Sequence, residues 1–142
     1  MIAFTIPGTP VGKGRPKFAR RGNFVTTYTP EKTASYENLV RMQADAAMAG
    51  RAPLEGAANV EVVLMILPPA SWSQKKRTAA LAGEIFPTSK PDVDNVIKGI
   101  FDAMNDVVWR DDKQVVDLVV RKRYAETPMA KVVVKELKGE GA

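Results

Sequence analysis

The chain has 142 residues, 45% of them hydrophobic and 26% charged, which fits one globular domain with a buried core. It contains no cysteine and no histidine. Disulfides, thiolate metal sites, a histidine-based zinc site and a Ser-His-Asp triad are therefore excluded. Hydrolytic chemistry would have to use carboxylates, lysines, hydroxyls and oxygen-bound metals. The net charge of +5 favours a polyanionic partner without requiring one.

No apolar run approaches the ~20 residues that a membrane span needs. The N-terminus lacks the basic start and the long apolar stretch of a signal peptide. We therefore expect a cytoplasmic protein that makes no contact with a membrane.

Alternating and 3.6-residue patterns of apolar residues predict the secondary structure. The first half is predicted to hold a strand at 2–6, a Gly- and Pro-rich segment at 8–16, a strand at Phe24–Tyr28, a helix from Thr29-Pro30 to Ala49 and a strand at Val60–Leu67. The second half is predicted to hold a helix at Ser71–Gly83 with a Ser71/Gln74 capping box, a loop at Pro87–Pro91, a helix at Val93–Met104 and strands at Gln114–Tyr124 and Val132–Leu137. This order predicts a single α+β domain over residues 1–142, with helices on one face of a mostly antiparallel sheet.

The strand at Val60–Leu67 is apolar on both faces, which is more than a one-sided sheet needs. This excess favours a surface that pairs with a second copy of the chain. The alternative is a central strand covered by helices on both sides. Of the two tryptophans, Trp109 is expected in the core, and Trp72 is expected to be partly exposed at a subunit interface.

Two aspartates flank the predicted start of the helix at Val93–Met104, in the run Lys90-Pro91-Asp92-Val93-Asp94-Asn95. Because the apolar stripe of that helix begins at Val93, Asp92 and Asp94 should point away from the core. The partial positive charge of a helix N-terminus tolerates carboxylates there. Lys98 lies one turn after Asp94 on the same face. A helix cap with an exposed ion pair would explain Asp94 and Lys98, but it explains two aspartates less well.

A second acidic pair, Asp111-Asp112, occupies a turn before the predicted strand at Gln114–Tyr124, where aspartate is also a common turn residue. Since this strand follows the helix directly, we expect the helix start and the strand start to lie at one end of the domain. Three converging carboxylates would repel one another by ~4 kcal/mol per pair at about 4 Å. A divalent cation removes this cost, and oxygen ligands suit Mg²⁺ or Mn²⁺.

An Asp-x-Asp motif alone is weak evidence, because glycosyltransferases and aspartyl phosphatases also use one. A glycosyltransferase needs a larger nucleotide-binding domain than this chain offers. A phosphatase places the pair directly after a buried strand, whereas a Pro-containing loop precedes it here. Carboxylates with a metal and a lysine, by contrast, are what phosphodiester hydrolysis requires.

The run from Lys90 to Lys98, then Asp102-Ala103-Met104, then Trp109 to Val115, resembles the RusA family of Holliday-junction resolvases. The resemblance is specific over residues 90–122, which we take as the core motif, and residues 8–30 are similar to phage-type members. It implies a Mg²⁺-dependent endodeoxyribonuclease of DNA recombination and repair, common in prophages. Such enzymes act as homodimers on four-way junctions and make paired nicks. The implied metal ligands are Asp92, Asp94 and Asp112, with Asp111 as a further candidate, and Lys98 matches the essential lysine.

A basic arm at residues 13–21 holds five basic side chains in nine positions. It is either a solvated loop or, given a nuclease, an arm that touches DNA phosphates. The predicted DNA contacts are Lys13, Arg15, Lys17, Arg20, Arg21 and Lys90.

Three functions compete on this sequence. The first is a junction resolvase, the second is a less selective nuclease for branched DNA or flaps, and the third is a DNA-binding protein whose acids are structural. Cleavage assays on junction, flap and linear DNA separate them.

Overall fold

The computed structural model describes residues 1–14, 17–22, 24–28 and 31–138, and for 17–21 and 24–28 it describes only the backbone. The strands are β1 (Ile2–Pro7), β2 (Lys17–Arg21), β3 (Phe24–Tyr28), β4 (Ala57–Ile66), β5 (Val115–Tyr124) and β6 (Met129–Leu137). The helices are α1 (Glu31–Met48), α2 (Gln74–Leu81) and α3 (Val93–Met104), with a 3₁₀ turn, η1 (Asp112–Gln114), before β5.

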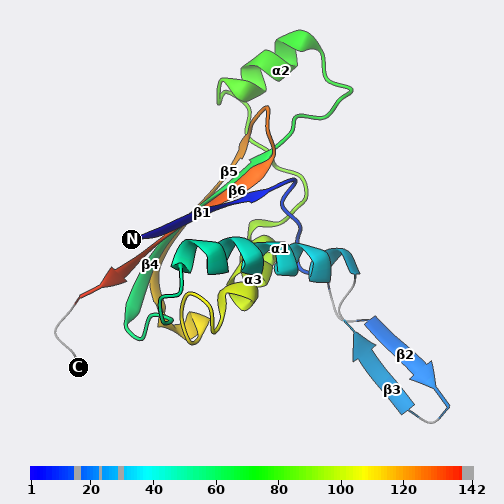
Figure 1. Cartoon of the computed structure of the whole chain (residues 1–142). Coiled ribbons are helices and arrows are strands. Elements are labelled where there is room, and N and C mark those ends of the chain that lie inside the picture. Colours follow the sequence, from blue (N-terminus) through cyan, green and yellow to red (C-terminus); the bar gives the residue numbers. More distant parts are fainter. Residues whose placement is uncertain (15–16, 23, 29–30, 139–142) are drawn as a thin grey trace.

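Four strands form one sheet in the order β1-β6-β4-β5. Strand β6 runs antiparallel to both β1 and β4, so that Phe4, Val132 and Val62 lie in one row across the three strands. Strands β4 and β5 run parallel. Helices α1 and α3 lie on the same side of this sheet (Figure 1). The predicted α+β domain with a mostly antiparallel sheet is confirmed, and β4 is a central strand that these two helices cover on one face.

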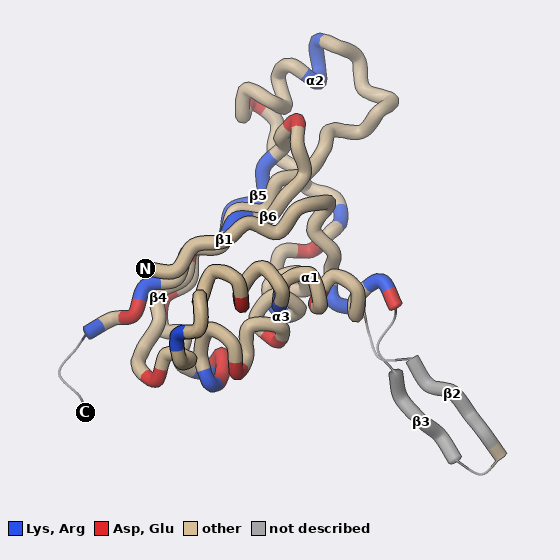
Figure 2. Tube along the Cα trace, viewed as in Figure 1, with Lys and Arg blue, Asp and Glu red and all other residues tan. Residues whose placement is uncertain are grey.

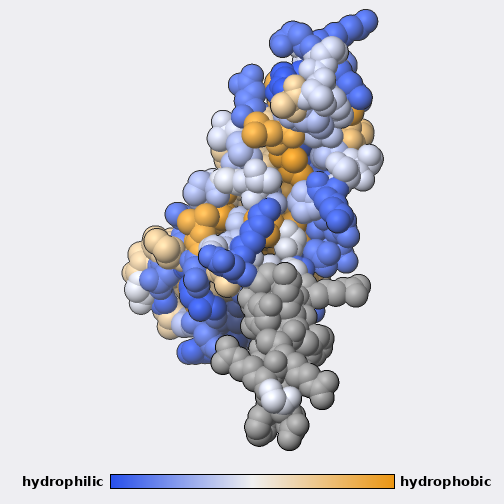
Figure 3. All heavy atoms as spheres, turned by 90° about the vertical axis from the view of Figure 1, so that its right-hand side faces the viewer, coloured by the Kyte–Doolittle hydropathy of each residue, from blue (hydrophilic) through white to orange (hydrophobic). Residues whose placement is uncertain are grey.

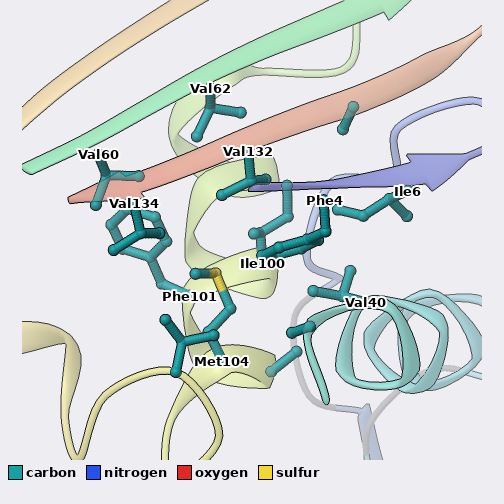
Figure 4. Close-up of a cluster of buried hydrophobic side chains, with 14 of the residues drawn as sticks. Phe4, Ile6, Val40, Val60, Val62, Ile100, Phe101, Met104, Val132 and Val134 are labelled. Carbon is teal, nitrogen blue, oxygen red and sulfur yellow. The ribbon is translucent and has the colours of Figure 1, made fainter. Parts of the chain in front are cut away.

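The core lies between the sheet and these two helices (Figure 4). On α3 it takes up the predicted apolar stripe, including Val96, Ile100 and Met104, which are fully buried. Trp109 is also fully buried, as predicted. Its indole meets the Phe101 ring edge-on with 5.1 Å between ring centroids. Its Nε1 donates a hydrogen bond to Asn105 Oδ1 at 2.8 Å, which satisfies the polar atom of a buried aromatic.

Several element boundaries differ from the prediction. Residues 17–21, predicted only as part of the basic arm, form β2 and pair with β3 in a separate two-stranded sheet. Helix α2 starts later than expected and is capped by Ser73, whose Oγ accepts a hydrogen bond from Lys76 N at 3.2 Å, and not by Ser71. The reason is local, because a turn from Pro69 O to Trp72 N occupies the preceding residues. Both β4 and β6 begin three residues earlier than predicted.

Residues 67–90, which contain α2, contact the sheet at the far end of β5. Trp72 packs edge-on against Tyr124 with 5.3 Å between centroids, and Lys76 lies 4.1 Å from the centre of the Trp72 ring. Arg123 lies over Phe86 at 4.9 Å. Lysine and arginine residues are visible on α2 and along β5 and β6 (Figure 2). Trp72 is thus half-buried, in agreement with the expected partial exposure, and packs on Tyr124 of the same chain.

Strand β5 is an edge of the sheet, and it is unusually apolar for one. Val116 is 60% exposed, Leu118 42% and Val119 41%. Leu118 pairs with buried Val60 of β4 and therefore faces the helices, whereas Val119 pairs with Glu61 and faces the open side. Both sides of this edge consequently expose apolar surface.

Candidate active site

Helix α3 presents the first two carboxylates. Asp92 is its N-cap residue, and its side chain makes no capping hydrogen bond. Asp94 lies in the first turn. Asp92, Asp94 and Lys98 are all exposed, whereas the opposite face of the helix is buried. Packing does not require these three charges, which leaves them available for chemistry.

The start of α3 is held in place by Lys122 of β5. The Lys122 ammonium donates hydrogen bonds to Ser89 O at 2.7 Å and to Pro91 O at 3.0 Å. The sequence analysis did not single out Lys122. It follows Leu118 and Val120 on the side of β5 that faces the helices, and a lysine there is expected to have a hydrogen-bond partner within the protein. Two hydrogen bonds to the loop before Asp92 fix where the helix begins.

This contact corrects one expectation about the site. Lys122 lies about 23 Å along β5 from Val115, at about 3.3 Å per residue. The start of α3 therefore lies beside the end of β5 and not beside its beginning, because the helix runs back over the strand. The start of β5 lies toward the C-terminal end of α3, where Asn105 contacts Trp109.

Asp112 is the first residue of η1, and η1 packs against α3. Asp94, Lys98 and Phe101 follow each other at i, i+4 and i+7, so they form one stripe along α3. Phe101 contacts Trp109, three residues before Asp112. The half-buried Asp112 thus follows a segment that packs on the C-terminal half of α3, where Trp109 meets Phe101.

The turn around Asp112 is built by its neighbours. Asp111 Oδ1 accepts a hydrogen bond from Lys113 N at 2.9 Å, as one half of a capping box. The other half is Gln114, whose Oε1 accepts from the backbone of Arg110 and Asp111 and whose Nε2 donates to Leu54 O at 2.8 Å. Asp111 and Gln114 therefore shape the turn, and the sequence had marked Asp111 only as a further candidate ligand.

The carboxylates do not form a closed ligand set. Within the ranges that the structure describes, no three acidic side chains lie close enough together to hold a metal ion. The ion pairs found in the described ranges involve three other acids, Glu37, Glu55 and Asp102. By the chemistry of their oxygen donors alone, Asp92, Asp94 and Asp112 suit Mg²⁺ or Mn²⁺.

Lys13, predicted to touch DNA, is engaged inside the protein. Its ammonium donates a hydrogen bond to Asp102 Oδ2 at 2.5 Å and lies 3.1 Å from Glu37 Oε1. Partial burial lowers the pKa of Lys13, but the hydrogen bonds and charges of Asp102 and Glu37 outweigh it and hold this pKa above its usual 10.5. Lys13 therefore clamps the N-terminal segment to α1 and α3. Among the other predicted DNA contacts, Lys90 is exposed, and the side chains of Arg15, Lys17, Arg20 and Arg21 lie outside the described residues.

The sequence profile described as Endodeoxyribonuclease RusA matches residues 7–135, which include every carboxylate of the site. The chain belongs to the RusA family. Its members are endodeoxyribonucleases, so the suspected relationship and the nuclease class are both confirmed. A relative within curated proteins is "Uncharacterized protein YqaN" of Bacillus subtilis (strain 168), 37% identical over 141 residues and covering 96% of each chain. In the described part of this RusA chain, no helix has the length and hydropathy to cross a membrane.

The clamp in this RusA family member predicts a stability effect. We expect Lys13→Met to lower the free energy of unfolding by about 1–3 kcal/mol, because it leaves Asp102 and Glu37 facing each other without a cation. Thermal unfolding followed by circular dichroism measures this loss. Lys131→Met, at an exposed position on β6, is the matched control.

The same clamp has a pH signature. Since the pKa of Lys13 is raised on folding, its stabilisation is complete below the unfolded value of 10.5 and is lost as pH rises through the folded pKa. Burial also raises the pKa of Tyr36 to about 12. Because this pKa is higher in the folded state, wild type and Lys13→Met both lose stability above about pH 10. The difference between wild type and Lys13→Met is therefore the quantity to follow. A difference that persists unchanged at high pH would contradict the clamp.

Proposed function

We propose that the protein is a Mg²⁺-dependent endonuclease that resolves Holliday junctions by paired nicks, in DNA recombination and repair. One observation supports this most. Asp92 and Asp94 at the start of α3 and Lys98 one turn later are exposed, so packing does not use their charges, and Asp112 stands in η1, which contacts the same helix.

In this proposal Asp92, Asp94 and Asp112 would hold Mg²⁺, with Mn²⁺ as a substitute. Such a cation supplies Lewis acidity to a phosphoryl group and lowers the pKa of attacking water. Lys98 stabilises the negative charge that develops on the scissile phosphate. Lys122 and the Asp111–Gln114 capping box act indirectly, because they fix the segments on which the carboxylates stand.

The remaining DNA contacts are proposed from charge. Lys90 is exposed beside Asp92, and Arg15, Lys17, Arg20 and Arg21 belong to the segment that contains β2. Phosphate contacts of this kind supply most of the affinity of a nuclease for DNA and make it dependent on salt.

The deciding experiment uses one labelled four-way junction, one flap and one linear duplex, each with Mg²⁺, with Mn²⁺ and with a chelator. Metal-dependent, symmetric nicks in the junction alone support the resolvase. Equal cutting of the flap supports a less selective branched-DNA nuclease. Junction binding without cutting under either metal supports a DNA-binding protein whose acids are structural.

We further propose that the protein acts as a homodimer through the edge strand β5. Two cuts on two strands need two sites in one complex, and a twofold pair supplies them. The exposed apolar residues Val116, Leu118 and Val119 lie on the edge of the sheet that has no neighbouring strand among the described residues. Pairing with β5 of a second copy would cover them and satisfy the backbone groups of that edge.

Val119→Glu is the test of this interface, because Val119 faces away from α3 and the carboxylates. We expect light scattering at micromolar concentration to show a dimer for wild type and a monomer for the variant. Met42→Glu on α1, where the side chain is 67% exposed, introduces the same charge elsewhere and should stay dimeric. A wild-type protein that remains monomeric even on junction DNA would contradict paired cutting.

A further inference from the structure

A groove runs from Asp92 along the N-terminal segment of the chain. Its first part is a cavity of about 510 Å³ between residues 9–14, the start of α1 at Lys32 and Thr33, and Lys90–Asp92 with Asn95. Its second part is a cavity of about 530 Å³ that continues along α1 as far as Leu39. The two parts share Thr9, Val11 and Lys32. Each has a volume within the range of about 300–1,000 Å³ that is typical of small-molecule sites.

The walls of this groove are fixed. Lys13 N donates a hydrogen bond to Asn95 O at 3.0 Å, and Gly14 N donates one to Thr33 Oγ1 at 2.9 Å. At the other end, Gly8 N donates to Pro128 O at 3.1 Å. The Lys13 clamp ties the same segment to α1 and α3. A groove that is already formed loses little entropy when a ligand enters it.

The lining combines apolar and cationic groups with two acids, Glu31 and Asp92. Pro10, Val11 and Pro91 offer apolar surface. Lys32 and Lys90 are exposed and take part in none of the ion pairs found between described residues. Apolar surface between hydrophilic residues is visible on the side of the molecule where the N-terminal segment leaves β1 (Figure 3). This combination suits a chain of sugars and bases joined by phosphates.

We propose that this groove binds the nucleotides of one DNA strand next to the scissile phosphate, with Lys32 and Lys90 contacting their backbone phosphates. The inference rests on the proposed nuclease function, since Asp92 lines both the groove and the candidate metal site. It adds Lys32, which the sequence gave no reason to choose, and it assigns Lys90 to a specific part of the bound strand.

The first measurement is junction affinity in an Asp94→Asn background, where DNA can be bound without being cut. Adding Lys32→Ala should weaken binding about fivefold at about 50 mM salt. At about 200 mM salt the loss should be less than about twofold, because one phosphate contact fewer lowers the salt dependence. Lys131→Ala removes the same charge from an exposed position on β6 and should change binding less than twofold. Equal effects of the two variants would overturn the proposal.

The second measurement places the contact on the strand. Junctions carry one uncharged methylphosphonate at successive positions within three nucleotides of the cleavage site. When the methylphosphonate replaces the phosphate that Lys32 contacts, the contact is already lost, and Lys32→Ala should lower the affinity no further. The two changes then form a double-mutant cycle with a non-additive result. Additive losses at every position would overturn the groove as the path of the strand.

The two proposals fail in different ways. Absence of cleavage by wild-type protein on all branched substrates would remove the nuclease function, and the binding data would still decide the groove. Normal cleavage with additive losses for Lys32→Ala would remove the groove alone. No junction binding in the Asp94→Asn background would overturn both.

Discussion

Cleavage of a four-way junction should fall by about 10³-fold or more when Asp92, Asp94 or Asp112 is replaced by Asn, because several kcal/mol of metal-dependent stabilisation is lost. Folding and junction binding should persist, since Asp92 and Asp94 are exposed and Asp112 is only half-buried. Single-turnover cleavage at saturating protein, together with an affinity measurement, separates the two effects.

Matched variants sharpen this expectation. Asp106→Asn changes an exposed acid with a positive φ of 62°, which Asn adopts readily, and it should cut normally. Asp111→Asn keeps a good capping side chain, so any loss of cleavage reports metal ligation and not a broken turn. If the acids repel one another without metal, each active-site variant should melt at or above the wild-type temperature. Wild-type cutting by any of the three Asn variants would remove that residue from the site.

Turnover should fall about 10²-fold in Lys98→Ala, with junction affinity changed far less. The reason is that Lys98 stands one turn from Asp94 on the exposed stripe of α3, where it can stabilise charge that develops only during the reaction. Single-turnover rates at saturating protein give the chemical step, and Kd is measured without divalent metal.

Lys113→Ala is the control for Lys98, because Lys113 is an exposed lysine in the neighbouring turn. It should retain near wild-type turnover. A Lys98→Ala protein that binds weakly but reacts at the normal rate once saturated would show that Lys98 is a phosphate contact only.

Local patterns predicted much of this fold because local chemistry determines it. The apolar stripe of α3 and the burial of Trp109 followed from helical spacing and side-chain size. The parallel pairing of β4 with β5 was not predictable, since each strand is apolar enough to pair in either direction. The direction of α3 relative to β5 depends on that pairing, which is why the helix start was expected at the wrong end of the strand.

For the candidate site, the sequence could suggest residues but not their contacts. The spacing of Asp92, Asp94 and Lys98 on one helix is contained in the sequence. The partners of Lys13, however, are 24 and 89 residues away along the chain, so nothing local distinguishes an internal clamp from a DNA contact. The alternation along β5 could have marked Lys122 as a residue facing the helices, but not its acceptors, which are backbone oxygens of a loop 31 and 33 residues away.

The parallel pair β4 and β5 also bears on how the proposed site assembles. All four proposed catalytic residues lie in residues 67–114, the crossover that joins these strands. Closing so long a connection is entropically costly and slow compared with forming a hairpin. The Lys122 contacts tie the start of α3 to β5, and η1 leads directly into that strand, so undocking β5 from β4 would free both ends of the proposed site from the sheet. Hydrogen exchange in β5 and metal affinity should therefore change together in variants that weaken this docking, so a chain with an undocked β5 holds no assembled nuclease site.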